Sequence, residues 1–339
     1  MKELGINAKK AAHSAHMLST EDKNKVLKDL KTNLLNGKYE IFDANEQDIM
    51  NAEIMGLSEA MIDRLRVDED YLNTIVMGLD DVIKLDDPIG EILEERTLDN
   101  GLELTQVSVP LGVVGIIYES RPNVTVDAFA LNFKVSNACI LRGGKEAINT
   151  NIVFEAIIHD TLRENNIDEN MVQLIKDITR ESTQKLMKMN EYVDVLIPRG
   201  SQGLIDAVLK NSTIPVIETG AGNCHIYVDE SADLDKAVNI IENAKLQRPG
   251  VCNAVESLVV HKNIADKLII ALTKKLDNVA IYGDAVSQGI SPEILKAGSD
   301  DYYTEYLDLK MSLKVVGDIH EAIDHVNTHH THHSDAIIT

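Results

Sequence analysis

The sequence contains no tryptophan, and only three of its 339 residues are cysteine. Cys139, Cys224 and Cys252 are too few and too unevenly spaced for the disulfide framework of a small secreted protein. The N-terminal residues are polar and amphipathic, without the apolar core that a signal peptide needs. We therefore expect a protein of the reducing cytoplasm, whose core is built mainly from aliphatic side chains.

Positive charge is also scarce. The chain has 33 Lys and Arg against 55 Asp and Glu, which gives a formal net charge of -22. Such a field argues against binding to a nucleic-acid backbone or to an anionic membrane surface. No stretch approaches the roughly 18 consecutive apolar residues of a membrane-spanning helix. A small anionic substrate would need a local basic pocket, because the overall charge opposes it.

The first third of the chain favours helices and then a hairpin. Residues 3 to about 84 repeat apolar side chains at three- and four-residue spacing, which predicts a helical layer packed on a sheet. Residues 99–101, Asp-Asn-Gly, lie between alternating residues and predict a β-hairpin over 96–109. The exposed edges of such a hairpin need a partner. We expect it to cross an oligomer interface, and a plain surface hairpin is the alternative.

From Pro110 onward, apolar strands alternate with helices, which predicts an α/β protein with parallel sheets covered on both faces. A first series of strands is expected at 111–118, 138–142, 172–175, 193–197 and 215–217, and a second at 225–228, 257–260, 313–316 and 335–338. Ligands of such sheets bind beyond the carboxyl ends of the strands. The turns at 119–123, 142–145, 198–202 and 218–222 should therefore gather at one edge.

Cys252 is the candidate nucleophile. It lies in the segment 247–261, QRPGVCNAVESLVVH, where a glycine-containing turn leads into an apolar strand. A thiolate at the mouth of a sheet is a strong nucleophile that can hold an acyl group as a thioester. The alternative is that Cys252 is a small buried hydrophobe, as most free cysteines are.

Two further turns have the chemistry of a phosphate site. Arg142 and Lys145 flank two glycines after a strand, where two cations could hold the 2′-phosphate of an adenine ribose. A solvated turn with basic residues is the alternative. Gly200 and Ser201 open a helix, whose free N–H groups and positive dipole end suit a pyrophosphate.

Arg121 and Glu218 each follow a strand. Arg121 could meet an anionic substrate or form a structural ion pair, and Glu218 could be a general base or a satisfied carboxylate. The histidines of the tract 329–333, HHTHH, could bind a metal. Adjacent histidines on a loop seldom have the geometry of a closed site, so we expect no metal here.

These segments together resemble the gamma-glutamyl phosphate reductases, the proline-pathway family of the aldehyde dehydrogenase superfamily. The resemblance follows the same order along nearly the whole chain and is carried by VPLGVVGIIYESRPNVTVDA (109–128), ILRGGKEA (140–147), VDVLIPRGSQGLI (193–205), IPVIETGAGNCHIYVDESADLDKA (214–237), the Cys252 segment, DYYTEYLDL (301–309) and HSDAIIT (333–339). It implies an aldehyde dehydrogenase-like fold with a nucleotide-binding domain formed by 1–95 and 110–225, an oligomerisation hairpin at 96–109 and a catalytic domain at 226–339.

The resemblance also implies a reaction, the NADPH-dependent reduction of L-glutamate 5-phosphate to L-glutamate 5-semialdehyde and phosphate. Cys252 matches the family nucleophile, whose backbone N–H would stabilise the oxyanion together with either Arg121 or Asn123. Arg121 and Asn253 would contact the substrate.

The remaining matches concern the cofactor and the base. Arg142, Lys145, Gly200 and Ser201 would hold the cofactor, and Glu305 would reach its nicotinamide ribose. Glu218 matches the superfamily's general base, which activates water there, whereas a reductive enzyme must exclude water.

Two features depart from the family pattern. The tract 329–333 replaces a loop that usually carries glycine and serine, and the family continues for several tens of residues beyond HSDAI. We therefore keep as an alternative a truncated, inactive nucleotide-binding member of the superfamily. A third hypothesis is a cysteine hydrolase that pairs Cys252 with His225 or His261.

Overall fold

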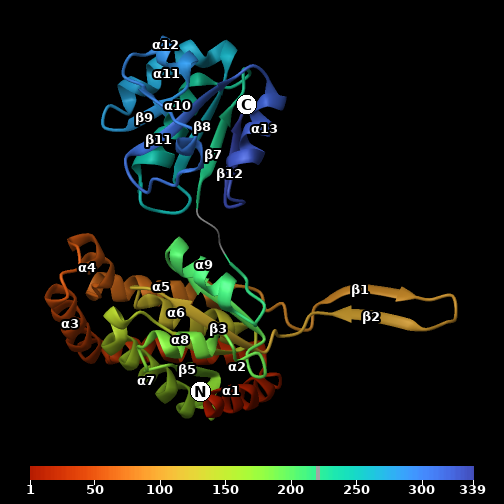
Figure 1. Ribbon diagram of the computed structural model, residues 1–339. Coiled ribbons are helices and arrows are strands. Elements are labelled where there is room, and N and C mark those ends of the chain that lie inside the picture. The colour runs from red at the N-terminus through yellow and green to blue at the C-terminus, as the bar shows by residue number, and fades with distance from the viewer. Residues whose placement is uncertain (219–221) are drawn as a thin grey trace. The chain divides into compact units, whose positions relative to one another are not determined.

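The computed structural model describes residues 1–218 and 222–339, without the side chains of Ala60 and Gln202. The chain divides into two compact units, residues 1–218 and 219–339 (Figure 1). This division precedes β7 (Cys224–Val228), whereas the family resemblance implied a boundary inside that strand, after residue 225. The whole of β7 belongs to the second unit because it pairs with β8 (Val255–His261) and β12 (Asp335–Ile338).

The predicted helical layer forms the start of the first unit. In α2, Val26, Leu27, Leu30 and Leu34 are buried at the spacing that places them on one face. Ser19 and Asp22 form a reciprocal capping box at its start. The helices are α1 (Lys2–Ala15), α2 (Thr20–Asn36), α3 (Lys38–Ile54), α4 (Glu59–Leu65) and α5 (Glu69–Lys84).

A hairpin follows, formed by β1 (Ile92–Thr97) and the antiparallel β2 (Glu103–Val107). It begins before the predicted residue 96 and turns over 98–102, where Gly101 has the positive φ of 86° that glycine tolerates. Every side chain of β1 is exposed, and Figure 1 shows the hairpin extending away from the helices of its unit. An isolated two-stranded hairpin is marginally stable in water.

The first sheet is parallel, in the order β5-β4-β3-β6. Its strands are β3 (Val113–Tyr118), β4 (Ala138–Arg142), β5 (Val172–Leu174) and β6 (Val195–Arg199). The helices that follow them are α6 (Asn123–Lys134), α7 (Ile148–Glu164), α8 (Arg180–Leu186) and α9 (Gln202–Asn211). All residues of β3, β4 and β5 are buried, as expected for strands covered on both faces.

The strand predicted at 215–217 is not a full member of this sheet. It pairs with β6 only through an isolated bridge between Leu196 and Val216. Pro215 and Ile217 are exposed, so this segment lacks the covering layer that buries the central strands.

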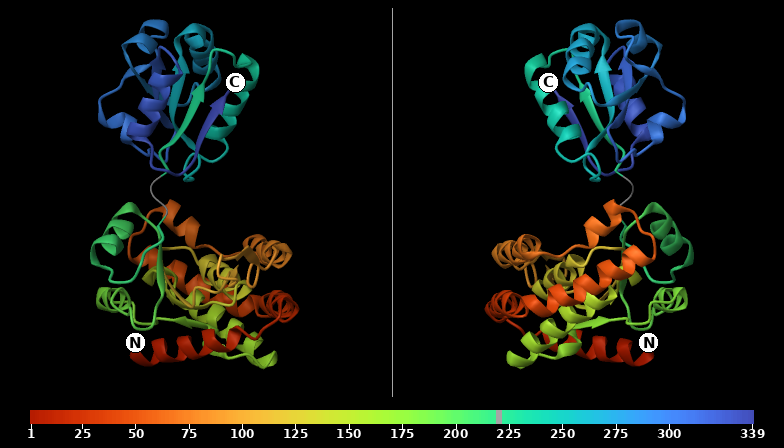
Figure 2. Two further views of the ribbon diagram at one scale, coloured as in Figure 1. Left: turned by 90° about the vertical axis from the view of Figure 1, so that its right-hand side faces the viewer. Right: turned by 90° about the vertical axis from the view of Figure 1, so that its left-hand side faces the viewer.

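The second sheet is also parallel, in the order β10-β9-β11-β8-β7-β12. Its other strands are β9 (Ala280–Gly283), β10 (Leu295–Lys296) and β11 (Lys310–Val316), and its helices are α10 (Leu234–Leu246), α11 (Lys262–Lys275), α12 (Ala285–Ile290) and α13 (Ile319–His329). Ile226 and Leu258 pack with α10 and α11, whereas the alternate residues Tyr227 and Val259 pack with α13. Helices therefore cover both faces (Figure 2). The short elements β9, α12 and β10 were missed from the sequence.

Candidate active site

Three of the predicted turns meet at the carboxyl edge of the first sheet. The Glu119 N–H donates to the Arg199 carbonyl oxygen at 3.1 Å. A Cβ added to Gly144 would lie 3.1 Å from the Ser120 nitrogen, and one added to Gly200 would lie 2.6 Å from a Glu119 carboxylate oxygen. The predicted clustering of 119–123, 142–145 and 198–202 is therefore confirmed. Of the fourth turn, residues 219–221 lie outside the described residues.

Arg142 and Lys145 are in contrasting environments. Arg142 is buried, and its guanidinium donates to the carbonyl oxygens of Gly143 and Ile178, the latter at 2.8 Å. Burial lowers the pKa of Arg142 from its usual value. Lys145 is exposed, and none of the described residues forms an ion pair with it. Lys145 thus has its ammonium group available to a ligand, whereas Arg142 holds the turn in place.

The helix start at Gly200 and Ser201 holds an anion supplied by the chain itself. The Ser201 N–H donates to one Glu119 oxygen at 2.7 Å, and its hydroxyl donates to the other at 2.9 Å. The Ser201 side chain therefore binds Glu119 and does not cap α9. The sequence predicted an anion site at this helix start but did not predict that Glu119 fills it. Glu119 follows β3 and Ser201 follows β6, so the two residues are far apart in the chain.

The turn after β3 is held by a residue of the helical layer. The Tyr71 hydroxyl donates to the Asn123 amide oxygen at 2.8 Å, and the Asn123 amide nitrogen donates to Asp127 at 2.7 Å. Burial raises the pKa of Asp127 from its ordinary value. The sequence showed no chemistry in α5, so only the packing reveals Tyr71. Arg121 is exposed, as is Glu218 at the end of the first unit.

Cys252 lies in the turn between α10 and β8, in the second unit, and is half-buried. The Cys224 thiol donates to the Cys252 carbonyl oxygen at 3.1 Å. A Cβ on Gly222 would lie 1.8 Å from that oxygen, so only glycine fits there. The Gly222 N–H donates to Glu305 at 2.8 Å. The fold thus gathers Cys252 and Glu305 around Gly222, with Asn253 exposed beside them.

A buried ion pair joins the two elements that flank the Cys252 turn, α10 and β8. Lys245 and Glu256 are both 0% exposed, and Lys245 Nζ donates at 3.0 Å to Glu256 and at 3.0 Å to the Val255 carbonyl oxygen. The other Glu256 oxygen accepts from the Leu307 N–H at 3.2 Å. Burial raises the pKa of Glu256 to about 7, against the opposing effect of Lys245. Glu256 therefore joins Lys245, near the end of α10, to the segment that follows Glu305.

Among the described residues, no hydrogen bond joins the Cys252 thiol to His225 or His261, the two bases of the hydrolase hypothesis. His261 stands at the far end of the seven-residue β8, about 20 Å along the strand, and accepts from the Asn263 N–H. His225 is 1% exposed, and burial lowers its pKa. The pairing of Cys252 with His261 is therefore excluded by geometry.

The tract 329–333 packs against the glycine turn. Asn223 donates to the His329 carbonyl oxygen at 2.8 Å, and its own N–H donates to the Thr331 hydroxyl at 3.0 Å. In the part of the chain that the structure describes, no three His, Cys, Asp or Glu side chains converge as metal ligands.

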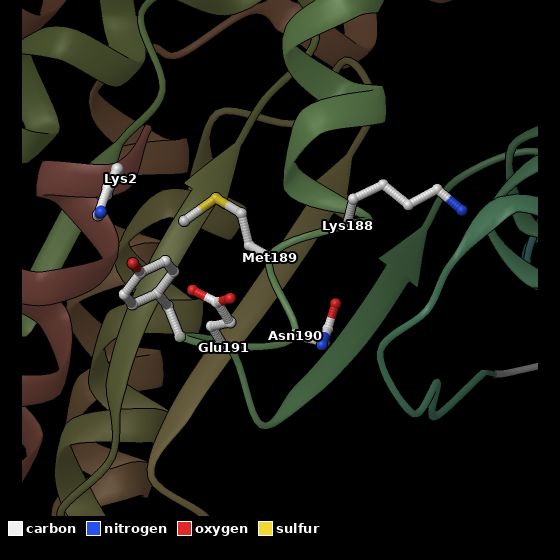
Figure 3. A pocket seen from close by; sticks show the side chains of 6 residues that line it. Lys2, Lys188, Met189, Asn190 and Glu191 are labelled. Carbon is white, nitrogen blue, oxygen red and sulfur yellow. The ribbon is translucent and has the colours of Figure 1, made fainter.

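A cavity of about 320 Å³ lies outside the predicted site (Figure 3). It is lined by Lys2 and residues 188–192. These residues precede β6, so the cavity is at the amino end of that strand, away from the edge where ligands of such sheets bind. Among the described helices, none is long and apolar enough to cross a membrane.

The chain is similar to known proteins over its whole length. Residues 6–299 match the model of the aldehyde dehydrogenase family. A gamma-glutamyl phosphate reductase of Lachnospira eligens is 48% identical over 100% of this chain and 82% of its own length. The crystal structure of a gamma-glutamyl phosphate reductase from Thermotoga maritima is 40% identical, with a TM-score of 0.95 over 99% of this chain and 82% of that one. An acetylating aldehyde dehydrogenase from Geobacillus thermoglucosidasius, at 17% identity and TM-score 0.66 over 100% of this chain and 80% of that one, shares the fold.

Proposed function

Because this chain belongs to the gamma-glutamyl phosphate reductases of the aldehyde dehydrogenase family, we propose that it reduces L-glutamate 5-phosphate with NADPH. The products are L-glutamate 5-semialdehyde and phosphate, in a step of proline biosynthesis. The observation that supports this most directly is the Cys252 turn. Its thiol is half-buried, and its backbone packs so closely on Gly222 that no side chain would fit at position 222.

Cys252 performs covalent catalysis in this proposal. Its thiolate attacks the acyl carbon of the substrate, the S–C bond forms, and the C–O bond to phosphate breaks, which leaves a thioester. When bound, the nicotinamide cofactor supplies the hydride that reduces the thioester carbonyl. The resulting thiohemiacetal on Cys252 releases the aldehyde when its C–S bond breaks, and the thiolate is restored.

Each step passes through an oxyanion that needs fixed hydrogen-bond donors. Among the described residues, no hydrogen bond engages the Cys252 backbone N–H, so this group is available as the first donor. Arg121 and Asn123 are the two alternatives for the second. Tyr71 and Asp127 orient the Asn123 side chain. Arg121 is exposed, and its positive charge would attract an anionic substrate.

The residues of the first unit fit a phosphorylated nucleotide. The N–H and hydroxyl of Ser201 already bind a carboxylate in the place proposed for pyrophosphate, and the Lys145 ammonium group is exposed at the adjoining turn. Lys145 is the residue that we expect to select NADPH over NADH, through the 2′-phosphate of the ribose.

Replacing Lys145 with alanine should lower kcat/KM for NADPH by about tenfold and leave kcat/KM for NADH nearly unchanged, because one charge-assisted contact to the 2′-phosphate is lost. Steady-state kinetics with both cofactors measures this selectivity. Lys210→Ala, which removes an exposed lysine from the far end of α9, is the matched control. An equal loss with NADPH and NADH would show that Lys145 does not read the 2′-phosphate.

The proposed activity is measured most easily in reverse, as the phosphate-dependent reduction of NADP⁺ by glutamate 5-semialdehyde. Turnover should require added phosphate, because phosphate cleaves the thioester. NADPH binding without any turnover would instead favour the inactive nucleotide-binding alternative. Cofactor-free cleavage of esters would favour a hydrolase.

We also propose that the β1–β2 hairpin binds a second copy of this chain. Ile92 and Leu93 are 56% and 57% exposed, and Leu102 at the turn is 52% exposed, which is costly unless another surface covers them. Replacing residues 92–107 with a short Gly-Ser linker should convert an oligomer into single chains in light scattering. Thermal unfolding of the variant controls for damage to the fold. An unchanged mass would contradict this role of the hairpin.

A further inference from the structure

The carboxylate of Glu119 stands where the cofactor's pyrophosphate is expected. Glu119 directly follows β3, and its two oxygens accept from the N–H and the hydroxyl of Ser201 at 2.7 and 2.9 Å. Gly200 can approach because it has no Cβ, which would lie 2.6 Å from the carboxylate. The Ser201 N–H and hydroxyl lie at the start of α9, where free donors and the positive end of the helix dipole suit an anion.

The position of Glu119 is set by the backbone on both sides. Its N–H donates to the Arg199 carbonyl oxygen at 3.1 Å, which ties it to the end of β6. On the other side, a Cβ on Gly144 would lie 3.1 Å from the nitrogen of Ser120. The turn that starts at Glu119 thus lies between two glycine turns, and its side chain is directed at the helix start.

A carboxylate and a phosphate group cannot both accept from the same Ser201 N–H. We propose that Glu119 is a resident anion that competes with the pyrophosphate of the cofactor, so that NADPH must displace it to bind. This inference rests on the proposed function, because it assumes a cofactor at Ser201. Glu119 satisfies the donors at the start of α9 when no nucleotide is bound, and it weakens nucleotide binding by charge repulsion and by competition.

The turn that begins at Glu119 also carries the residues proposed to meet the substrate. Arg121 and Asn123 follow Glu119 in the same turn, and Asn123 begins α6. The Glu119 side chain can leave Ser201 by rotation, because the bond from its N–H to the Arg199 carbonyl oxygen holds the backbone in place. Glu119 therefore acts on cofactor binding, and the residues proposed to meet the substrate keep their positions.

The test is the affinity of Glu119→Gln for NADPH, measured by fluorescence titration. Glutamine keeps the shape but loses the charge, so its hold on the helix start is weaker. We expect the Kd for NADPH to fall by about two- to fivefold. Inorganic pyrophosphate, used as a competitor of NADPH, should become more effective by a similar factor. Without nucleotide, the variant should unfold at a slightly lower temperature than the wild type.

Glu146→Gln is the matched control, because Glu146 borders Gly144 in the same cluster and makes no contact with Ser201 in the described structure. Its Kd for NADPH should stay within about twofold of the wild-type value. An unchanged or higher Kd in Glu119→Gln overturns the inference, since a mere helix-stabilising role would alter only the unfolding temperature. A chain that binds NADPH but yields no semialdehyde would contradict the proposed function alone, and the ratio of the two Kd values would still decide the role of Glu119.

Discussion

Replacing Cys252 with alanine is expected to reduce phosphate-dependent turnover by at least about 10⁴-fold, because no other group of the turn can form the thioester. The same change should alter the free energy of unfolding by only about 1 kcal/mol, since the side chain is small and half-buried. Turnover of NADP⁺ with glutamate 5-semialdehyde and urea unfolding measure the two effects.

Cys139→Ala is the control for this experiment and should show the opposite pattern. Cys139 is 0% exposed within β4, and burial raises its pKa far above the ordinary range, so it is an inert part of the core. Its replacement should cost about 1–2 kcal/mol of stability while activity is retained. Alkylation by iodoacetamide, with NADPH absent, should fall mainly on Cys252 in the native wild type. A Cys252→Ala variant with near wild-type turnover would refute the covalent mechanism.

Breaking the buried pair of Lys245 and Glu256 is expected to destabilise the fold strongly. Both side chains are 0% exposed, so removal of one partner leaves the other uncompensated, at a cost of about 3–5 kcal/mol. Lys245→Met should also lower kcat, because the pair joins α10 to the start of β8, on either side of the Cys252 turn, and Glu256 also accepts from the Leu307 N–H. Urea unfolding of the full chain gives the stability change, and the rate of Cys252 alkylation reports on the turn.

The two single variants should depend on pH in opposite directions. Burial already raises the pKa of Glu256 to about 7 from 4.5, and loss of Lys245 raises it further. A carboxyl whose pKa is higher in the folded state than in the unfolded state stabilises the fold at low pH. This stability is lost as the pH rises through the folded-state pKa. Lys245→Met should therefore be less stable at pH 8 than at pH 6, when compared with the wild type at each pH.

Glu256→Gln leaves Lys245 buried without an anion. Burial lowers the pKa of Lys245 below its unfolded value of 10.5, and loss of Glu256 lowers it further, so stability should rise with pH toward that value. The double variant Lys245→Met/Glu256→Gln should recover much of the loss, because no buried charge remains. Equal pH trends in the two single variants would contradict this account of the pair.

The order and type of most elements followed from local patterns. Helix and strand spacing located α6, β4, α7 and four strands of the second sheet, β7, β8, β11 and β12, because covered parallel strands must be continuous apolar runs. The motif at Asp99–Gly101 located the hairpin, since few residues other than glycine tolerate the backbone of its turn. The short elements β9, α12 and β10 were missed because they span too few residues for a periodic signal.

The candidate site was predictable only in part. Residues that follow strands could be assigned to one edge because parallel strands end together, and this placed the turns of Glu119, Gly144 and Gly200 side by side from the sequence alone. Which of these residues contact one another was not predictable. Glu119 at Ser201, Tyr71 at Asn123 and Glu256 at Lys245 join segments that are distant or unpatterned in the chain.

The sequence by itself determined the α/β architecture and the family resemblance, and it singled out Cys252 as the candidate nucleophile, because each depends on residue type and local spacing. Only the tertiary structure decided which charges are free and which are already satisfied. Arg142 is committed to backbone carbonyl oxygens while Lys145 is not, and the anion site at α9 is filled by Glu119. Burial and hydrogen bonding are properties of three-dimensional neighbours, and the order of residues along a chain does not specify them.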